Sequence, residues 1–291
     1  MSKWTKWRDR ALRKIADLLG LGKSSSSSAT PAAGEPSSVS EISLAGLAVP
    51  EWDKCTRASC WGGTNASVRI MNCLSPKMPE SVFKERVAWT KARGANTIHL
   101  FLVNKGDGEY AGYSPWGVGK KPTAGEIDAA TVRTMRERLY YCHKQGLAVV
   151  IWLQADDSAD WAAALASNAD RCVARIVEAG LFGIASTVVA GLEMDEYWNA
   201  THARAVVSAI RAHYHYKVGT HHTGGKTTFA SLGDILFYQV EPGRSAAQIK
   251  ADTKSALKAG KPVNFFELSR GPARDLCEAA FSAGAFGVGN W

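Results

Sequence analysis

The chain has 291 residues, of which 46% are hydrophobic and 21% charged, an ordinary globular composition with ample length for one large core. No apolar run is long enough to span a bilayer, and the six cysteines show no CxxC spacing, which argues against a zinc ribbon or a dithiol redox motif. The net charge of +8 gathers mostly in the first 23 residues, so it does not indicate nucleic-acid binding by the rest of the chain.

Residues 1–22 are predicted to form a basic amphipathic helix that docks on a membrane surface, a protein assembly or its own domain. The apolar stripe recurs every three or four residues: Trp4, Trp7, Ala11, Ile15 and Leu18. Asp17 interrupts the apolar run from Ile15 to Leu21, so no signal peptide is predicted. Localisation stays unknown: cytoplasmic synthesis is expected, with action at a cell surface or on a virion as one setting. Residues 23–49, rich in Ser, Pro and Ala, are predicted to be a flexible linker.

Residues 50–291 alternate between short apolar runs and helical patterns. The runs predict strands over 68–73, 97–103, 147–153, 186–192, 217–220, 235–240, 262–266 and 285–289. The patterns between them predict helices over 79–92, 124–144, 159–179, 198–213, 245–259 and 272–283. Eight such strands predict an α/β fold, a single (β/α)8 TIM barrel with the amphipathic helix and linker in front of it.

In such a barrel the active site lies at the carboxyl ends of the strands. Glu193 follows the fourth predicted strand and Glu267 the seventh, and two carboxyl groups over one pocket are what glycoside hydrolysis requires. Polar and aromatic residues at the same ends are the predicted substrate contacts: Asn72, Asp156, Asp195, His221, His222, Tyr238, Gln239 and Trp291.

At Gly191-Leu-Glu193 and Phe265-Phe-Glu267 the chain resembles the clan of TIM-barrel glycoside hydrolases with catalytic glutamates at the ends of strands four and seven. This topological resemblance, over roughly residues 60–291, implies that Glu193 is the general acid/base and Glu267 the nucleophile of a retaining reaction. It also implies that Trp291 stacks under a sugar ring. Leu192 stands where the clan usually carries asparagine. The expected substrate is a polysaccharide or cell-surface glycan, and the basic arm suggests a bacterial or bacteriophage enzyme.

Other interpretations stay open. The cluster Glu193-Met-Asp195-Glu196 also suits a lysozyme- or chitinase-like hydrolase. A structural alternative is that Glu193 and Asp195 form salt bridges or cap the following helix. A further hypothesis is a structural barrel that binds carbohydrate without cleaving it. His221-His222 suggests a metal-dependent hydrolase, but adjacent residues of an extended segment point to opposite faces, so no metal and no cofactor is predicted.

Overall fold

The structure is a computed structural model that describes residues 57–59, 72–106, 108–155, 159–223, 226–239, 243–265 and 274–290. Eight parallel strands pair in a closed ring in the order β1-β10-β9-β8-β7-β6-β5-β2. They are β1 (Arg57–Ser59), β2 (Thr97–Val103), β5 (Ala148–Gln154), β6 (Ala185–Val189), β7 (Lys217–His222), β8 (Ile235–Tyr238), β9 (Val263–Phe265) and β10 (Gly287–Asn290). The predicted α/β fold with a parallel sheet is confirmed. The predicted arm and linker lie outside the described residues, and the division into domains stays a prediction.

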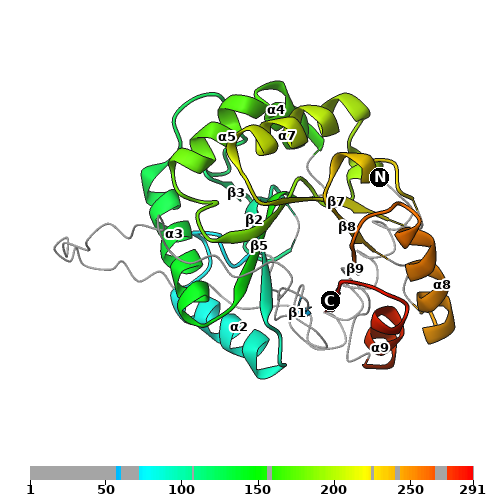
Figure 1. Cartoon of the computed structure of the whole chain (residues 1–291). Helices are drawn as coiled ribbons and strands as arrows, with labels where there is room; N and C mark the ends of the chain where they lie inside the picture. The colour runs from blue at the N-terminus through cyan, green and yellow to red at the C-terminus, as the bar shows by residue number, and fades with distance from the viewer. Residues whose placement is uncertain are drawn as a thin grey trace, which may run out of the picture. The chain divides into compact units, whose positions relative to one another are not determined.

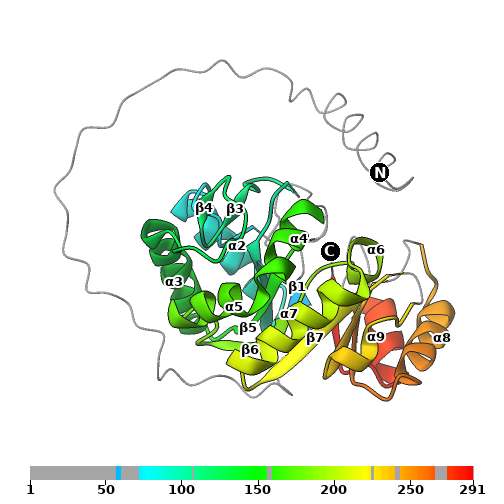
Figure 2. The ribbon, with the colours of Figure 1, turned by 90° about the horizontal axis from the view of Figure 1, so that it is seen from above.

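Helices surround the strands (Figure 1). They are α2 (Glu80–Ala92), α3 (Ala129–Lys144), α4 (Ala159–Ser167), α5 (Ala169–Glu178), α6 (Met194–Tyr197), α7 (Ala200–His213), α8 (Ala246–Leu257) and α9 (Arg274–Ser282). Helix α7 packs against α4 and α5, and α8 packs against α9 at the right of Figure 2. The described residues between β7 and β8 form only a short 3-10 helix, η2 (Ala230–Leu232), so the strand–helix alternation is less regular than predicted. None of the described helices combines the length and hydropathy needed to cross a membrane.

Local capping chemistry sets several helix ends. Gly94, with φ +72°, donates its N–H to the Lys91 carbonyl at 2.9 Å and ends the first described helix, α2. The Asp128 carboxylate accepts the Thr131 N–H at 2.7 Å, so α3 begins at residue 129 and not at the predicted residue 124. Side-chain caps also precede α7 and α8, where the predicted starts lie within two residues of the observed ones.

Two predicted elements need correction. The strand predicted over 68–73 is wrong at its end, because Asn72 and Cys73 lie in a turn; β1 is the first strand of the ring. The guanidinium of Arg138 donates to the carbonyls of Cys73, Ser75 and Met78. These hydrogen bonds satisfy backbone carbonyls of the turn, which in a strand would be satisfied by pairing with a neighbouring strand. The single helix predicted over 159–179 is two helices that meet at Asn168.

The loop after β2 is more ordered than a Gly-rich loop suggests. It contains a two-stranded antiparallel hairpin, β3 (Tyr113–Ser114) and β4 (Gly117–Val118). The Tyr113 hydroxyl donates to the Phe101 carbonyl at 2.8 Å, and Tyr113 is fully buried. The hairpin is therefore held against β2, the barrel strand that precedes it.

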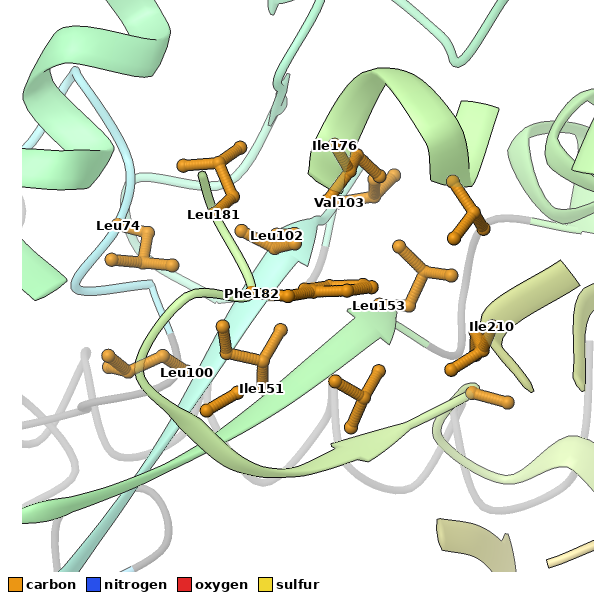
Figure 3. Close-up of a cluster of buried hydrophobic side chains, with 14 of the residues drawn as sticks. Leu74, Leu100, Leu102, Val103, Ile151, Leu153, Ile176, Leu181, Phe182 and Ile210 are labelled. Carbon is orange, nitrogen blue, oxygen red and sulfur yellow. The ribbon is translucent and has the colours of Figure 1, made fainter. Parts of the chain in front are cut away.

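The largest apolar cluster lies between the strands and the helices around them (Figure 3). Alternate side chains of β2 and β5, among them Leu100, Leu102, Ile151 and Leu153, gather around Phe182 in this cluster. Each of these side chains is 4% exposed or less, and full burial of one such side chain contributes about 1.5–3 kcal/mol. The intervening side chains of the same strands point into the ring, where the candidate site begins.

Candidate active site

Aromatic rings fill the middle of the barrel. Trp152 of β5 lies at the centre, with ring centroids of His221 at 5.2 Å, Phe237 at 5.3 Å, Phe101 at 5.6 Å and His99 at 5.9 Å. The strand register sets Phe101 beside Trp152 and His221 beside Phe237. The Trp152 indole N–H donates to His99 Nδ1 at 3.0 Å. The interior is thus a packed aromatic core that carries two histidines.

Gly219 of β7 makes room for this core. A Cβ at this position would lie 2.7 Å from the Phe237 ring and 3.0 Å from Val189 Cγ2, closer than packed atoms approach. The segment Lys217-Val-Gly-Thr220 carries a weak strand pattern in the sequence because this glycine contributes no side chain of its own.

Glu193 lies just beyond the carboxyl end of β6, the fourth strand of the ring from β1 in chain order. Its backbone is left-handed, with φ 43° and ψ 45°. A non-glycine residue in this region costs about 1–2 kcal/mol, and such strain gathers at functional sites. Glu193 precedes α6, yet its side chain makes no cap hydrogen bond to that helix. The helix-capping interpretation of this glutamate is therefore wrong.

The Glu193 backbone N–H donates to His221 Nδ1 at 2.8 Å. An imidazole nitrogen that accepts a hydrogen bond carries no proton, so His221 is neutral with its proton on Nε2. Complete burial, followed by the proximity of His222 and His99, holds the pKa of His221 well below its ordinary value. His221 is thus a permanent acceptor for the Glu193 amide near neutral pH.

His222 points away from His221, as predicted for adjacent residues of a strand. Its Nε2 accepts the Phe229 N–H at 2.8 Å, and burial lowers its pKa to about 4 against the opposing effect of Asp195. Each histidine thus uses one ring nitrogen to hold a backbone amide. Among the residues that the structure describes, no three His, Cys, Asp or Glu side chains are grouped so as to hold a metal ion.

Asp195 is part of a buried polar junction. Its side chain is 1% exposed, and it accepts the Thr223 N–H at 3.0 Å and the Thr223 hydroxyl at 3.1 Å, with Lys226 Nζ at 3.4 Å. The Thr223 hydroxyl is also 3.0 Å from Glu196 Oε1. These contacts tie α6 to the end of β7, which gives Asp195 a structural role.

Tyr238 and Gln239 lie at the end of β8. The Tyr238 ring packs edge-on against Phe265 at 5.5 Å, in the apolar cluster shared with α8 and α9 on the outside of the ring. Burial raises the pKa of its hydroxyl, and the nearby Asp252 adds to the shift. The Gln239 N–H donates to the His222 carbonyl at 2.9 Å. Tyr238 therefore lies in the layer outside the barrel interior that holds His221.

Asn72 belongs to a second polar group, around the loop after β2. Its side chain accepts from Asn104 Nδ2 at 2.7 Å and donates to the Glu109 carbonyl at 2.8 Å, and both asparagines are fully buried. Arg86 of α2 holds the Glu109 carboxylate at 2.9 Å. Asn72 thus fixes the loop, and Arg86 was missed by sequence reasoning although its spacing from Phe83 placed it on the buried face of α2.

The structure brings Glu193, Asp195, His221 and His222 together around the ends of β6 and β7. Three predicted site residues, Glu267, Asp156 and Trp291, lie outside the described residues. Glu267 follows the last residue of β9, Phe265, by two positions in the sequence. Sequence reasoning missed His99 and Trp152, whose signal was a polar or indole group at the inward-facing positions of two otherwise apolar strands.

No protein-family model matches the chain, and no curated protein matches its sequence. Solved structures do match. A protein from Bacteroides vulgatus named as a glycoside hydrolase aligns with a TM-score of 0.58 at 11% identity, over 82% of this chain and 55% of the other, so this chain spans about half of that protein. The GH5-4 broad-specificity endoglucanase from Clostridium longisporum aligns with a TM-score of 0.53 at 12% identity, over 82% of this chain and 85% of the other.

A glutamate-to-alanine variant of a GH5_18 protein from Streptomyces cattleya, in complex with Manβ1-4GlcNAc, aligns with a TM-score of 0.55 at 12% identity, over 81% of this chain and 70% of the other. At these identities the similarity is one of fold. The predicted distant resemblance to TIM-barrel glycoside hydrolases is confirmed at that level.

Proposed function

We propose that this protein is a glycoside hydrolase that cleaves a polysaccharide or cell-surface glycan with retention of configuration, with Glu193 as general acid/base and Glu267 as nucleophile. The observation that carries the proposal is the backbone of Glu193. This glutamate stands at the end of the fourth barrel strand in a strained conformation held by a buried histidine, and its carboxylate is not used to cap α6. The fold shared with solved glycoside hydrolases supports the same reading.

The proposed mechanism divides the work between the two carboxyl groups. Glu193 protonates the leaving oxygen while Glu267 attacks the anomeric carbon, and Glu193 then takes a proton from the water that releases the sugar. Retention requires the two carboxyl groups to lie about 5–5.5 Å apart. The carboxyl ends of parallel barrel strands meet at one face, so residues just after β6 and β9 suit that requirement.

Asp195 favours this mechanism over a lysozyme- or chitinase-like one that uses the acidic cluster. Its carboxylate is buried and already engaged by Thr223 and Lys226. A carboxylate so held has no free face for a sugar or a water, and we therefore propose Glu193 alone as the acid of this segment.

The substrate proposal draws on the names of the structural neighbours. They include an endoglucanase and a protein bound to Manβ1-4GlcNAc, so β-linked glycans are the first class to test. Bacterial cell-wall and capsular polysaccharides come next, because a basic helix over residues 1–22 would deliver the barrel to a membrane surface or a protein assembly. A bacterial or bacteriophage source belongs to the same proposal.

The test is a reducing-sugar screen of the full chain on these glycans beside Glu193→Gln and Glu267→Gln, with Glu85→Gln as the control because Glu85 is exposed on α2. Both site variants should lose roughly 10²–10⁴-fold in kcat, as expected for the removal of a proton-transfer or nucleophilic group. The control should match the parent. Proton NMR of the first product should show the anomer of the substrate.

Two results would oppose the proposal. Full activity in Glu193→Gln would remove this glutamate from the reaction. Glycan binding without release of reducing ends, unchanged in both variants, would instead favour a carbohydrate-binding barrel that has no hydrolytic activity.

A further inference from the structure

The amide of Glu193 is held by a side chain of β7, the strand that pairs with β6. Residues before it follow the barrel: the Ala190 N–H donates to the Gly219 carbonyl at 3.1 Å, and the Leu192 N–H donates to the Gln154 carbonyl at 3.0 Å. At Glu193 the backbone leaves this pattern and turns left-handed. Its N–H has the imidazole of His221 as acceptor, at 2.8 Å, in place of a backbone carbonyl.

We propose that His221 is a positioning residue, whose unprotonated Nδ1 fixes the left-handed backbone of Glu193 and thereby aims its carboxylate at the reacting bond. This inference rests on the proposed role of Glu193. A change of φ from the left-handed to the ordinary right-handed region would swing the Cα–Cβ bond and send the carboxylate in another direction. The hydrogen bond from the amide removes that freedom.

The orientation of His221 is itself set by the barrel core. Its ring meets Trp152 edge to face at 5.2 Å, with an interplanar angle of 73°. Trp152 is in turn held by the hydrogen bond of its indole N–H to His99. Side chains from β2, β5 and β7 thus converge to present one acceptor nitrogen to a residue that follows β6. Because all three side chains are fully buried, the acceptor has little room to move.

Three variants at position 221 and elsewhere separate positioning from simple packing. His221→Asn keeps an acceptor oxygen close to the place of Nδ1, whereas His221→Leu keeps apolar volume and removes the acceptor. His215→Leu is the control, since His215 is an exposed histidine before β7. Thermal unfolding of each variant first establishes that it is folded. The two readouts are hydrogen exchange of the Glu193 amide, followed by NMR, and the separate values of kcat and KM.

In His221→Leu we expect the Glu193 amide to exchange at least about 10-fold faster and kcat to fall about 10–100-fold, with KM changed less than about threefold. His221→Asn should keep most of the amide protection and most of kcat, and the control should match the parent. Unchanged protection of the Glu193 amide in His221→Leu would overturn the proposal, as would equal losses of kcat in the Asn and Leu variants.

The two readouts also keep this inference apart from the proposed function. A parent protein that cleaves no glycan refutes the proposed function. The exchange rate of the Glu193 amide decides the role of His221 in either case, because it needs no substrate.

Discussion

Acidification should destabilise this protein well above the pH at which its carboxylates titrate. Burial lowers the pKa of His99 to about 3 and that of His222 to about 4, whereas both imidazoles titrate at about 6.5 in the unfolded chain. At pH values between the folded and the unfolded pKa, the imidazoles are protonated in the unfolded state and neutral in the folded state. Stability is therefore fully present above pH 6.5 and falls as the pH drops below it.

The magnitude follows from the distance between the pH and the unfolded pKa. At pH 5 the unfolded imidazole lies one and a half pH units below its pKa, which lowers the free energy of unfolding by about 2 kcal/mol per histidine. His99 and His222 together remove about 4 kcal/mol, a large part of the 5–15 kcal/mol typical of a whole domain. The depressed pKa of His221 acts in the same direction.

The assay is urea unfolding followed by tryptophan fluorescence, at several pH values between 8 and 5. His99→Asn should be less stable than the parent at pH 8. Between pH 6 and 5, however, its free energy of unfolding should fall less steeply, and the slope should be smaller than that of the parent by about 1.4 kcal/mol per pH unit. His215→Gln, at an exposed position, should keep the slope of the parent. A free energy of unfolding that stays constant from pH 7 to 5 in the parent would refute the neutral, buried state of these histidines.

Two substitutions test the packing and the polar junction around the candidate acid. Gly191→Ala places a Cβ 2.5 Å from Trp198 Cζ2 and should lower the free energy of unfolding by about 1–3 kcal/mol; a urea midpoint equal to that of the parent would contradict this close contact. Asp195→Asn weakens the hydrogen bonds that Thr223 donates to this buried carboxylate and its ion pair with the half-exposed Lys226, and should lower the free energy of unfolding by about 1–3 kcal/mol. Asp160→Asn, at an exposed ion pair, should change it by less than about 1 kcal/mol. Equal effects of the two changes would show that the junction is not a buried one.

The fold could be predicted wherever strands carry their own signal. The segments Thr97–Val103 and Ala148–Gln154 are buried along their whole length, so their apolar composition matches their place between the barrel interior and the helices. The strand β1, with the sequence Arg-Ala-Ser, has no such signal, and its pairing with β10 and β2 defines it. The apolar run ending at Cys73 misled for the opposite reason, because Arg138 of α3, far along the chain, satisfies that backbone in a turn.

The candidate site, like the fold, could be predicted only where the local sequence carries the signal. That an acid follows the fourth strand can be read from the sequence, because the end of an apolar run marks the end of the strand. The opposite directions of His221 and His222 were also predictable from the alternation of side chains along a strand. The left-handed backbone of Glu193 was not, because the local sequence contains no glycine or asparagine at that position, and the group that stabilises it comes from another strand.

The barrel interior supports the backbone of Glu193 as well as filling space, so its polar side chains limit which substitutions it tolerates. An interior of aliphatic layers would stabilise the ring equally well, since it needs no hydrogen bonds. Here Trp152 carries an indole N–H into the core and is satisfied by His99, and its ring supports the imidazole that accepts the Glu193 amide. A substitution such as Trp152→Leu would therefore remove more than buried area, because it would loosen the acceptor on which a strained backbone depends. The aromatic core and the backbone of the candidate acid are therefore coupled, and a change in one is expected to affect the other.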